Sequence, residues 1–168
     1  MLIRVFGLQN DSIVDGPGIR YAVFTQGCPH HCPGCHNPDS HSFDGGQEKD
    51  TSEILDAVRK NPLLDGVTFS GGEPFEQPEA LAEIAKEVHK LGMNVVTYTG
   101  YTFEELLQGK QQRPGWDALM QQTDYLVDGR FERDQRSIAL KFKGSANQRV
   151  LDMKQSLAAG KAVLSEYN

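Results

Sequence analysis

The sequence is poor in cysteine, has no long apolar run and carries no excess of positive charge. Its only three cysteines, Cys28, Cys32 and Cys35, lie within one short stretch. An odd number of cysteines so close together cannot form a disulfide framework, because such frameworks join distant parts of a chain. We therefore interpret this stretch as a metal site.

Charge and hydropathy exclude two classes of partner. The chain has 23 acidic and 17 basic side chains, and its formal net charge of -6 has the wrong sign for bulk attraction to nucleic acid. No segment approaches the roughly 18 apolar residues that span a bilayer, and the first residues lack the pattern of a secretory signal. We expect a soluble cytoplasmic protein that binds neither nucleic acid nor a membrane.

Other expected features are missing as well. The sequence shows no internal repeat, linker or low-complexity tract, so its 168 residues are expected to form a single domain over 1–168. It also offers no persuasive Ser/His/Asp constellation and no pair of carboxylates for general acid–base work. The sequence therefore gives no support to a mechanism that rests on a general base or a serine nucleophile.

Strands alternate with helices along the chain. We expect strands over 19–26, 66–72, 94–100, 124–131 and 138–142, and helices over 51–60, 77–92, 102–108, 116–120 and 144–160. Such alternation implies a parallel sheet built from right-handed crossovers. A complete eight-fold barrel needs about 250 residues, so the predicted fold is α/β, a partial, open βα barrel with a mainly parallel sheet.

Four unusual segments each follow a predicted strand. They read GCPHHCPGC, SGGEP, TYTGY and VDGRF. The ends of parallel strands form one edge of a sheet, so these segments are expected to converge there.

The cysteine spacing is C-x3-C-x2-C, which differs from that of bacterial ferredoxins and of paired zinc knuckles. Three thiolates suffice to hold a [4Fe-4S] cluster by three irons and leave the fourth iron open. The alternative is a structural zinc site with three cysteines and one histidine. The candidate fourth ligands would be His30, His31, His36 and His41.

This spacing after a strand resembles the signature of the radical S-adenosylmethionine (SAM) superfamily. The resemblance implies that Cys28, Cys32 and Cys35 bind a [4Fe-4S] cluster whose open iron is chelated by SAM, within a barrel of the radical SAM type. It also implies that an electron delivered through the cluster cleaves SAM to methionine and a 5'-deoxyadenosyl radical, which abstracts a hydrogen atom.

The SGGEP segment is a candidate SAM-binding turn. Gly71 and Gly72 let a ligand approach the backbone, and Glu73 offers a carboxylate to a cationic amine. The segment resembles the GGE motif that holds the methionyl amino group in the superfamily. Taken alone, the same residues also read as a plain turn.

Two further groups are candidates for SAM contact. Asp128 and Arg130 are two residues apart at a strand end, so both can point to one face, although a surface ion pair is an equal reading. Resemblance to related activating enzymes assigns the SAM contact to Arg130. Thr99, beside Tyr98, is expected to line the same pocket.

The VDGPGIR segment precedes the cysteine stretch and resembles the DGPG segment of glycyl-radical-enzyme activases. That resemblance implies that Asp15, Gly16 and Arg20 dock the glycine loop of a partner enzyme. Without the cysteine stretch, it would read only as a turn.

Three further segments make the resemblance to one group of activases more specific. CPGC, YLVDGRFERD and KGSANQR are similar to those of the activating proteins of anaerobic (class III) ribonucleotide reductases, and the chain lacks the cysteine-rich insert of two-cluster activases. We expect an oxidoreductase that generates a glycyl radical on such a reductase, with flavodoxin or ferredoxin as electron donor. The alternatives are a pyruvate formate-lyase type activase, a small-molecule radical SAM enzyme and a zinc-stabilised binding module.

Overall fold

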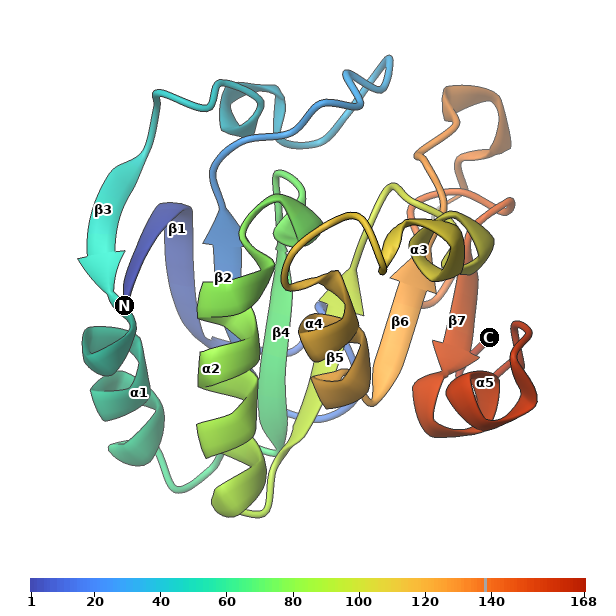
Figure 1. Ribbon diagram of the computed structural model, residues 1–168. Coiled ribbons are helices and arrows are strands. Elements are labelled where there is room, and N and C mark those ends of the chain that lie inside the picture. The colour runs from blue at the N-terminus through green and yellow to red at the C-terminus, as the bar shows by residue number, and fades with distance from the viewer. Residues whose placement is uncertain (138) are drawn as a thin grey trace.

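A computed structural model describes residues 1–137 and 139–168, which form one sheet with helices packed on one face (Figure 1). The strands are β1 (Leu2–Ser12), β2 (Arg20–Thr25), β3 (Gln47–Asp50), β4 (Gly66–Gly71), β5 (Asn94–Tyr98), β6 (Tyr125–Asp128) and β7 (Arg149–Asp152). The helices are α1 (Thr51–Arg59), α2 (Pro78–Lys90), α3 (Phe103–Gly109), α4 (Trp116–Gln122) and α5 (Met153–Ala159).

The seven strands lie in the order β3-β1-β2-β4-β5-β6-β7. The central strands β2, β4, β5 and β6 run parallel to one another, whereas β1 pairs antiparallel with both β2 and β3, and β7 pairs antiparallel with β6. The sheet is open, with β3 and β7 at its two edges. This confirms the α/β class and the parallel centre, while the barrel type remains a prediction.

The main helices form where the apolar periodicity places them. In α2, Leu81, Ile84 and Val88 are fully buried against the sheet, as their spacing on one helical face predicts. Helix α3 begins with the predicted capping box, in which Thr102 and Glu105 each accept a hydrogen bond from the other's backbone N–H. These helices cover the sheet and leave its strand ends free to form a site.

The C-terminal predictions were partly wrong. Residues 139–142 form no strand, and Ile138 lies outside the described residues. The predicted helix over 144–160 is instead strand β7 followed by α5, because Val150 and Leu151 pair with β6 and are buried there. The helix begins only after Asp152, whose side chain accepts a hydrogen bond from the backbone N–H of Gln155.

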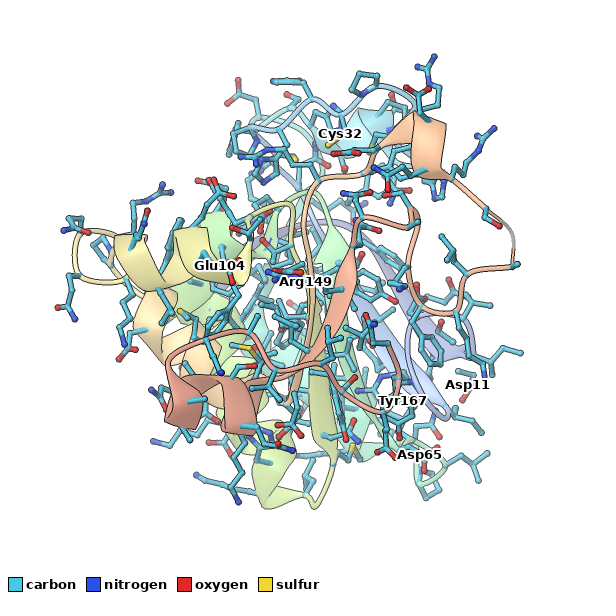
Figure 2. The ribbon with its side chains drawn as sticks, turned by 90° about the vertical axis from the view of Figure 1, so that its right-hand side faces the viewer. Asp11, Cys32, Asp65, Glu104, Arg149 and Tyr167 are labelled. Carbon is cyan, nitrogen blue, oxygen red and sulfur yellow. The ribbon has the colours of Figure 1, made fainter. Side chains whose placement is uncertain are left out.

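The sheet face opposite the helices carries a smaller apolar cluster. Val96, Val127 and Val150 are buried there, with Phe142 and Tyr167 packed against them. Figure 2 shows Tyr167 and Asp11 on the side of the sheet away from the helices, and Cys32 at the end where the parallel strands finish. Within the described residues, no helix is long and apolar enough to cross a membrane.

Candidate functional site

A cavity of about 420 Å³ lies at the carboxyl ends of the parallel strands. All four segments that were expected to converge contribute to its wall, which confirms that prediction. From these segments and the loop before β2, its lining includes Val14, Asp15, Cys28, His30, Cys32, Cys35, Ser70, Gly71, Gly72, Tyr98, Thr99, Gly100, Gly129 and Phe131.

The three cysteines occupy the loop after β2, and their thiols are all free. Cys28 is buried, whereas Cys32 and Cys35 are partly exposed. The loop turns back on itself between Cys32 and Cys35, where the Cys35 N–H donates to the Cys32 carbonyl at 3.1 Å. In residues 1–137 and 139–168, no three His, Cys, Asp or Glu side chains gather around one point as ligands of a single metal ion.

The environment of the thiols disfavours their charged forms. Burial raises the pKa of Cys28 to about 11, and the nearby Glu73 adds to this, against an opposing backbone hydrogen bond from His30. Burial also raises the pKa of Cys32, while a backbone hydrogen bond from Phe131 and the charge of Arg130 oppose it. Cys28 and Cys32 therefore keep their thiol protons at neutral pH, so the binding of a metal has to displace those protons.

The carboxylate of Glu73 is completely buried and surrounded by donors. It accepts hydrogen bonds from His30 Nε2 at 2.7 Å, the Gly100 N–H at 2.8 Å, the Thr99 hydroxyl at 2.8 Å and the Phe75 N–H at 3.0 Å. A buried carboxylate needs such partners, since an unpaired one is costly. The carboxylate of Glu73 is thus bonded to donors of the protein, and its role as a ligand of the SAM amine stays a prediction.

The glycine turn can instead offer its backbone to a ligand. Gly71 and Gly72 line the cavity, and a Cβ on Gly72 would lie 2.5 Å from the carbonyl oxygen of Gly27. Only glycine fits so close to the start of the cysteine loop. The Glu73 N–H also donates to this carbonyl at 2.8 Å, so the turn and the loop are joined through their backbones.

The VDGRF segment turns a different face to the cavity from the one expected. Gly129 and Phe131 line the cavity, and Asp128 and Arg130 alternate with them. The buried carboxylate of Asp128 binds Arg149, whereas the exposed Arg130 pairs with Glu105 at 3.3 Å. Both side chains pair with charged residues of the protein, as the ion-pair reading allows, and their contacts with SAM stay a prediction. The positive charge of Arg130 acts to lower the pKa of Cys32.

The DGPG segment places one of its three candidates beside the cavity. Asp15 lines the cavity, and Gly16 is buried against the side chain of Arg20. Arg20 itself has no exposed surface, because it donates to the Thr68 hydroxyl at 2.7 Å and to the Pro17 carbonyl at 2.9 Å. The side chain of Arg20 thus supports the DGPG segment from within the fold, and a role for Arg20 in docking a partner stays a prediction.

Gly34 has a neighbour that the sequence did not reveal. A Cβ on Gly34 would lie 2.8 Å from Nε of Arg133, so the arginine side chain occupies the space beside this glycine. The Phe and Tyr side chains that line the cavity are Phe24, Tyr98, Phe131 and Phe142. Phe131 belongs to the VDGRF segment, but no pattern in the sequence predicts that it lines the cavity.

Comparison with known proteins shows the family. Residues 14–151 match the 4Fe-4S single cluster domain. The chain is 34% identical over 145 residues to the anaerobic ribonucleoside-triphosphate reductase-activating protein of Vibrio cholerae, covering 81% of this chain and 89% of that protein. The corresponding Escherichia coli K12 protein is 33% identical over 147 residues, with 81% and 90% covered.

This chain belongs to the radical SAM activating-enzyme family. Another member, the pyruvate formate-lyase-activating enzyme of Clostridium pasteurianum, is 42% identical over 114 residues, which cover 62% of this chain and 48% of that enzyme. The alignment thus spans about half the length of that relative. The cofactors of the family are a [4Fe-4S] cluster and SAM, and the donor set here fits them: three free thiols open on one cavity, with no fourth cysteine in the sequence.

Proposed function

We propose that this protein reductively cleaves SAM and generates a glycyl radical on an anaerobic ribonucleotide reductase. One observation carries the proposal: the three free thiols Cys28, Cys32 and Cys35 open on the same cavity as the backbone of the Gly71–Gly72 turn. The thiols would hold the cluster, and the turn would hold the methionine part of SAM beside it.

When bound, the cluster and SAM supply one-electron cleavage of the sulfonium carbon–sulfur bond, giving methionine and a 5'-deoxyadenosyl radical that takes a hydrogen atom from glycine. The chain's own residues bind, orient and shield these groups. Tyr98, Phe131 and Phe142 give the cavity an apolar wall that limits the access of water. Thr99 also lines the cavity, but its hydroxyl is committed to Glu73.

The relatives support the proposed choice of partner. Proteins named as activators of the anaerobic reductase align over 89% to 90% of their length, which favours that reductase as partner. The higher identity to the pyruvate formate-lyase-activating enzyme, 42%, keeps an activase of that type as the second candidate. We further propose flavodoxin or ferredoxin as electron donor and the reducing cytoplasm as the compartment, since the three thiols are free.

The surface before β2 supports a protein partner. Ile13 and Val14 are 72% and 71% exposed, and Val14 also lines the cavity next to Asp15. Exposed apolar side chains beside a reaction cavity favour contact with another polypeptide. We propose that this surface receives the glycine loop of the reductase.

The function is tested by anaerobic reconstitution with iron and sulfide, followed by a chemical reductant and SAM. We expect a brown protein that releases 5'-deoxyadenosine and methionine in equal amounts. A folded, iron-loaded sample that never releases 5'-deoxyadenosine contradicts the proposal. A colourless, stably folded protein that retains zinc would favour the zinc-stabilised module.

The partner requires a second experiment. The reconstituted protein is mixed with the anaerobic reductase, SAM and reductant, and electron paramagnetic resonance (EPR) is used to detect a glycyl radical. A pyruvate formate-lyase sample is tested in parallel. We expect the radical only with the reductase and only when the cluster is present, so a Cys32→Ala variant should give no signal.

A further inference from the structure

One imidazole connects the cysteine loop to the turns beside it. His30 lies midway between Cys28 and Cys32, two residues from each. Its Nε2 donates to Oε1 of Glu73 at 2.7 Å, and the two side chains are 5% and 0% exposed. The loop after β2 is thereby bonded to the turn after β4.

The same carboxylate reaches the end of a third strand. Glu73 accepts hydrogen bonds from the hydroxyl of Thr99 and the N–H of Gly100, which follow β5. Three neighbouring strand ends are therefore tied to one buried group. Charge-assisted hydrogen bonds away from water are strong and geometrically specific, so this group restrains the relative positions of the three segments.

The imidazole ring is fixed on its other sides as well. The Tyr101 ring packs edge-on against it, with 4.6 Å between centroids, and the Tyr101 hydroxyl donates to Glu76 at 2.8 Å. A Cβ on Gly100 would lie 2.4 Å from Cδ2 of His30. The ring thus occupies a slot of its own size, which glycine at position 100 leaves open.

We propose that His30 is a positioning residue whose hydrogen bond to Glu73 holds the cysteine loop at a fixed distance from the Gly71–Gly72 turn. This inference rests on the proposed function, in which the loop holds the cluster and the turn holds SAM. His30 acts through Glu73 on the distance between the two bound groups. Residues that orient metal ligands in this indirect way typically change affinity or activity about 10- to 100-fold when they are replaced.

The test compares His30→Leu, which removes the donor, with His30→Gln, which keeps one. Gly100→Ala is a second way to break the hydrogen bond between His30 and Glu73. Its methyl group displaces the His30 ring, while the imidazole and the residue 100 N–H both remain in the protein. The control is His89→Leu, which breaks another histidine–carboxylate contact, from His89 Nε2 on α2 to Asp124, the residue before β6, at 2.7 Å. Iron content and the EPR spectrum of the reduced cluster are measured while SAM is titrated.

We expect His30→Leu and Gly100→Ala to bind iron as the wild type does but to need about 10- to 100-fold more SAM to change the cluster spectrum. His30→Gln should need far less SAM than His30→Leu, and His89→Leu should match the wild type. Equal SAM dependence in the wild type, His30→Leu and Gly100→Ala overturns the proposal.

Three other outcomes are also informative. Loss of iron in both His30→Leu and His30→Gln would make the imidazole a cluster ligand and so overturn its positioning role. If His30→Leu does not fold, Gly100→Ala decides the question alone. A wild-type cluster whose spectrum never responds to SAM contradicts the proposed function instead, so the two failures are distinguishable.

Discussion

Arg149 on β7 binds the carboxylate of Asp128 at the end of β6, with Nε 3.0 Å from Oδ1. Asp128 is 1% exposed and also accepts a hydrogen bond from the N–H of Phe103 at 2.8 Å. The pair therefore joins the edge strand, its neighbour and the start of α3. Figure 2 shows Arg149 beside Glu104, to which it also donates at 2.7 Å.

We predict that Arg149→Met lowers the free energy of unfolding by about 3–5 kcal/mol, because it leaves the buried carboxylate of Asp128 without its charge partner. Arg130→Met is the control, since Arg130 forms a surface pair with Glu105 that is worth about 0–1 kcal/mol. Urea unfolding of the two variants measures the difference. Equal losses would show that the Arg149 pair is no stronger than a surface contact.

The contact between Arg149 and Glu104 makes the free energy of unfolding depend on pH. The hydrogen bond from Arg149 holds the pKa of the Glu104 carboxyl below its usual value. A lowered acid pKa stabilises the fold above the unfolded pKa, about 4.3, and this contribution is lost as the pH falls through the lower folded pKa. We expect the difference in the free energy of unfolding between the wild type and Arg149→Gln to become smaller as the pH falls below about 4.3. Urea unfolding at several pH values measures this difference. A difference that widens on acidification would contradict this assignment.

The cysteine loop predicts which side chains hold iron. Replacing Cys28, Cys32 or Cys35 singly with alanine should abolish SAM cleavage, because a cluster with an open iron depends on all three thiolates. His41→Ala should leave the iron content nearly unchanged, although its buried Nε2 finds no hydrogen-bond partner among the described residues. Iron per chain and 5'-deoxyadenosine release measure these effects. Iron loss in His41→Ala would favour a closed site with four ligands.

The glycine turn predicts a steric effect. Gly72→Ala would place a methyl group 2.5 Å from the Gly27 carbonyl oxygen and push the turn away from the cysteine loop. We expect it to weaken SAM binding by at least about tenfold, in line with other changes to the surroundings of a metal site. Gly7→Ala is the matched control, since its Cβ would meet no described atom within 4 Å. Equilibrium binding of SAM to the reconstituted variants distinguishes the two.

The exposed pair before β2 predicts a separation of activities. Ile13→Ser should still release 5'-deoxyadenosine but should form less glycyl radical on the reductase, because Ile13 is exposed and does not line the cavity. Lys154→Ser on α5 serves as the surface control. If Ile13→Ser forms as much radical as the wild type, the docking surface lies elsewhere.

The sequence predicts the site's neighbourhood better than the role of each side chain. Strand ends converge because topology requires it, so Cys28, Gly71 and Thr99 were placed at one cavity from local patterns alone. Whether a charged residue such as Glu73 or Arg20 faces a ligand depends on donors and acceptors from distant segments. Those long-range contacts leave no local periodicity in the sequence.

The edge of the sheet at β7 was harder to predict from the sequence than the central strands. Val150 and Leu151 fit an apolar helical stripe as well as a buried strand, and only pairing with β6 decides between them. Asp152 carried the missing signal, since an aspartate followed three residues later by glutamine is typical of a helix start. Reading that cap would have separated β7 from α5.

The open edges of the sheet, at β3 and β7, have a consequence for the chemistry that it can host. In a closed barrel the loops at the strand ends surround a site on every side, whereas the strand ends of an open sheet leave part of that ring missing. A reactive radical still requires an enclosure that keeps water out. Under the proposed function, the docked reductase completes that enclosure, so the molecule that is modified is also the lid, and radical formation is protected only while the correct substrate is in place.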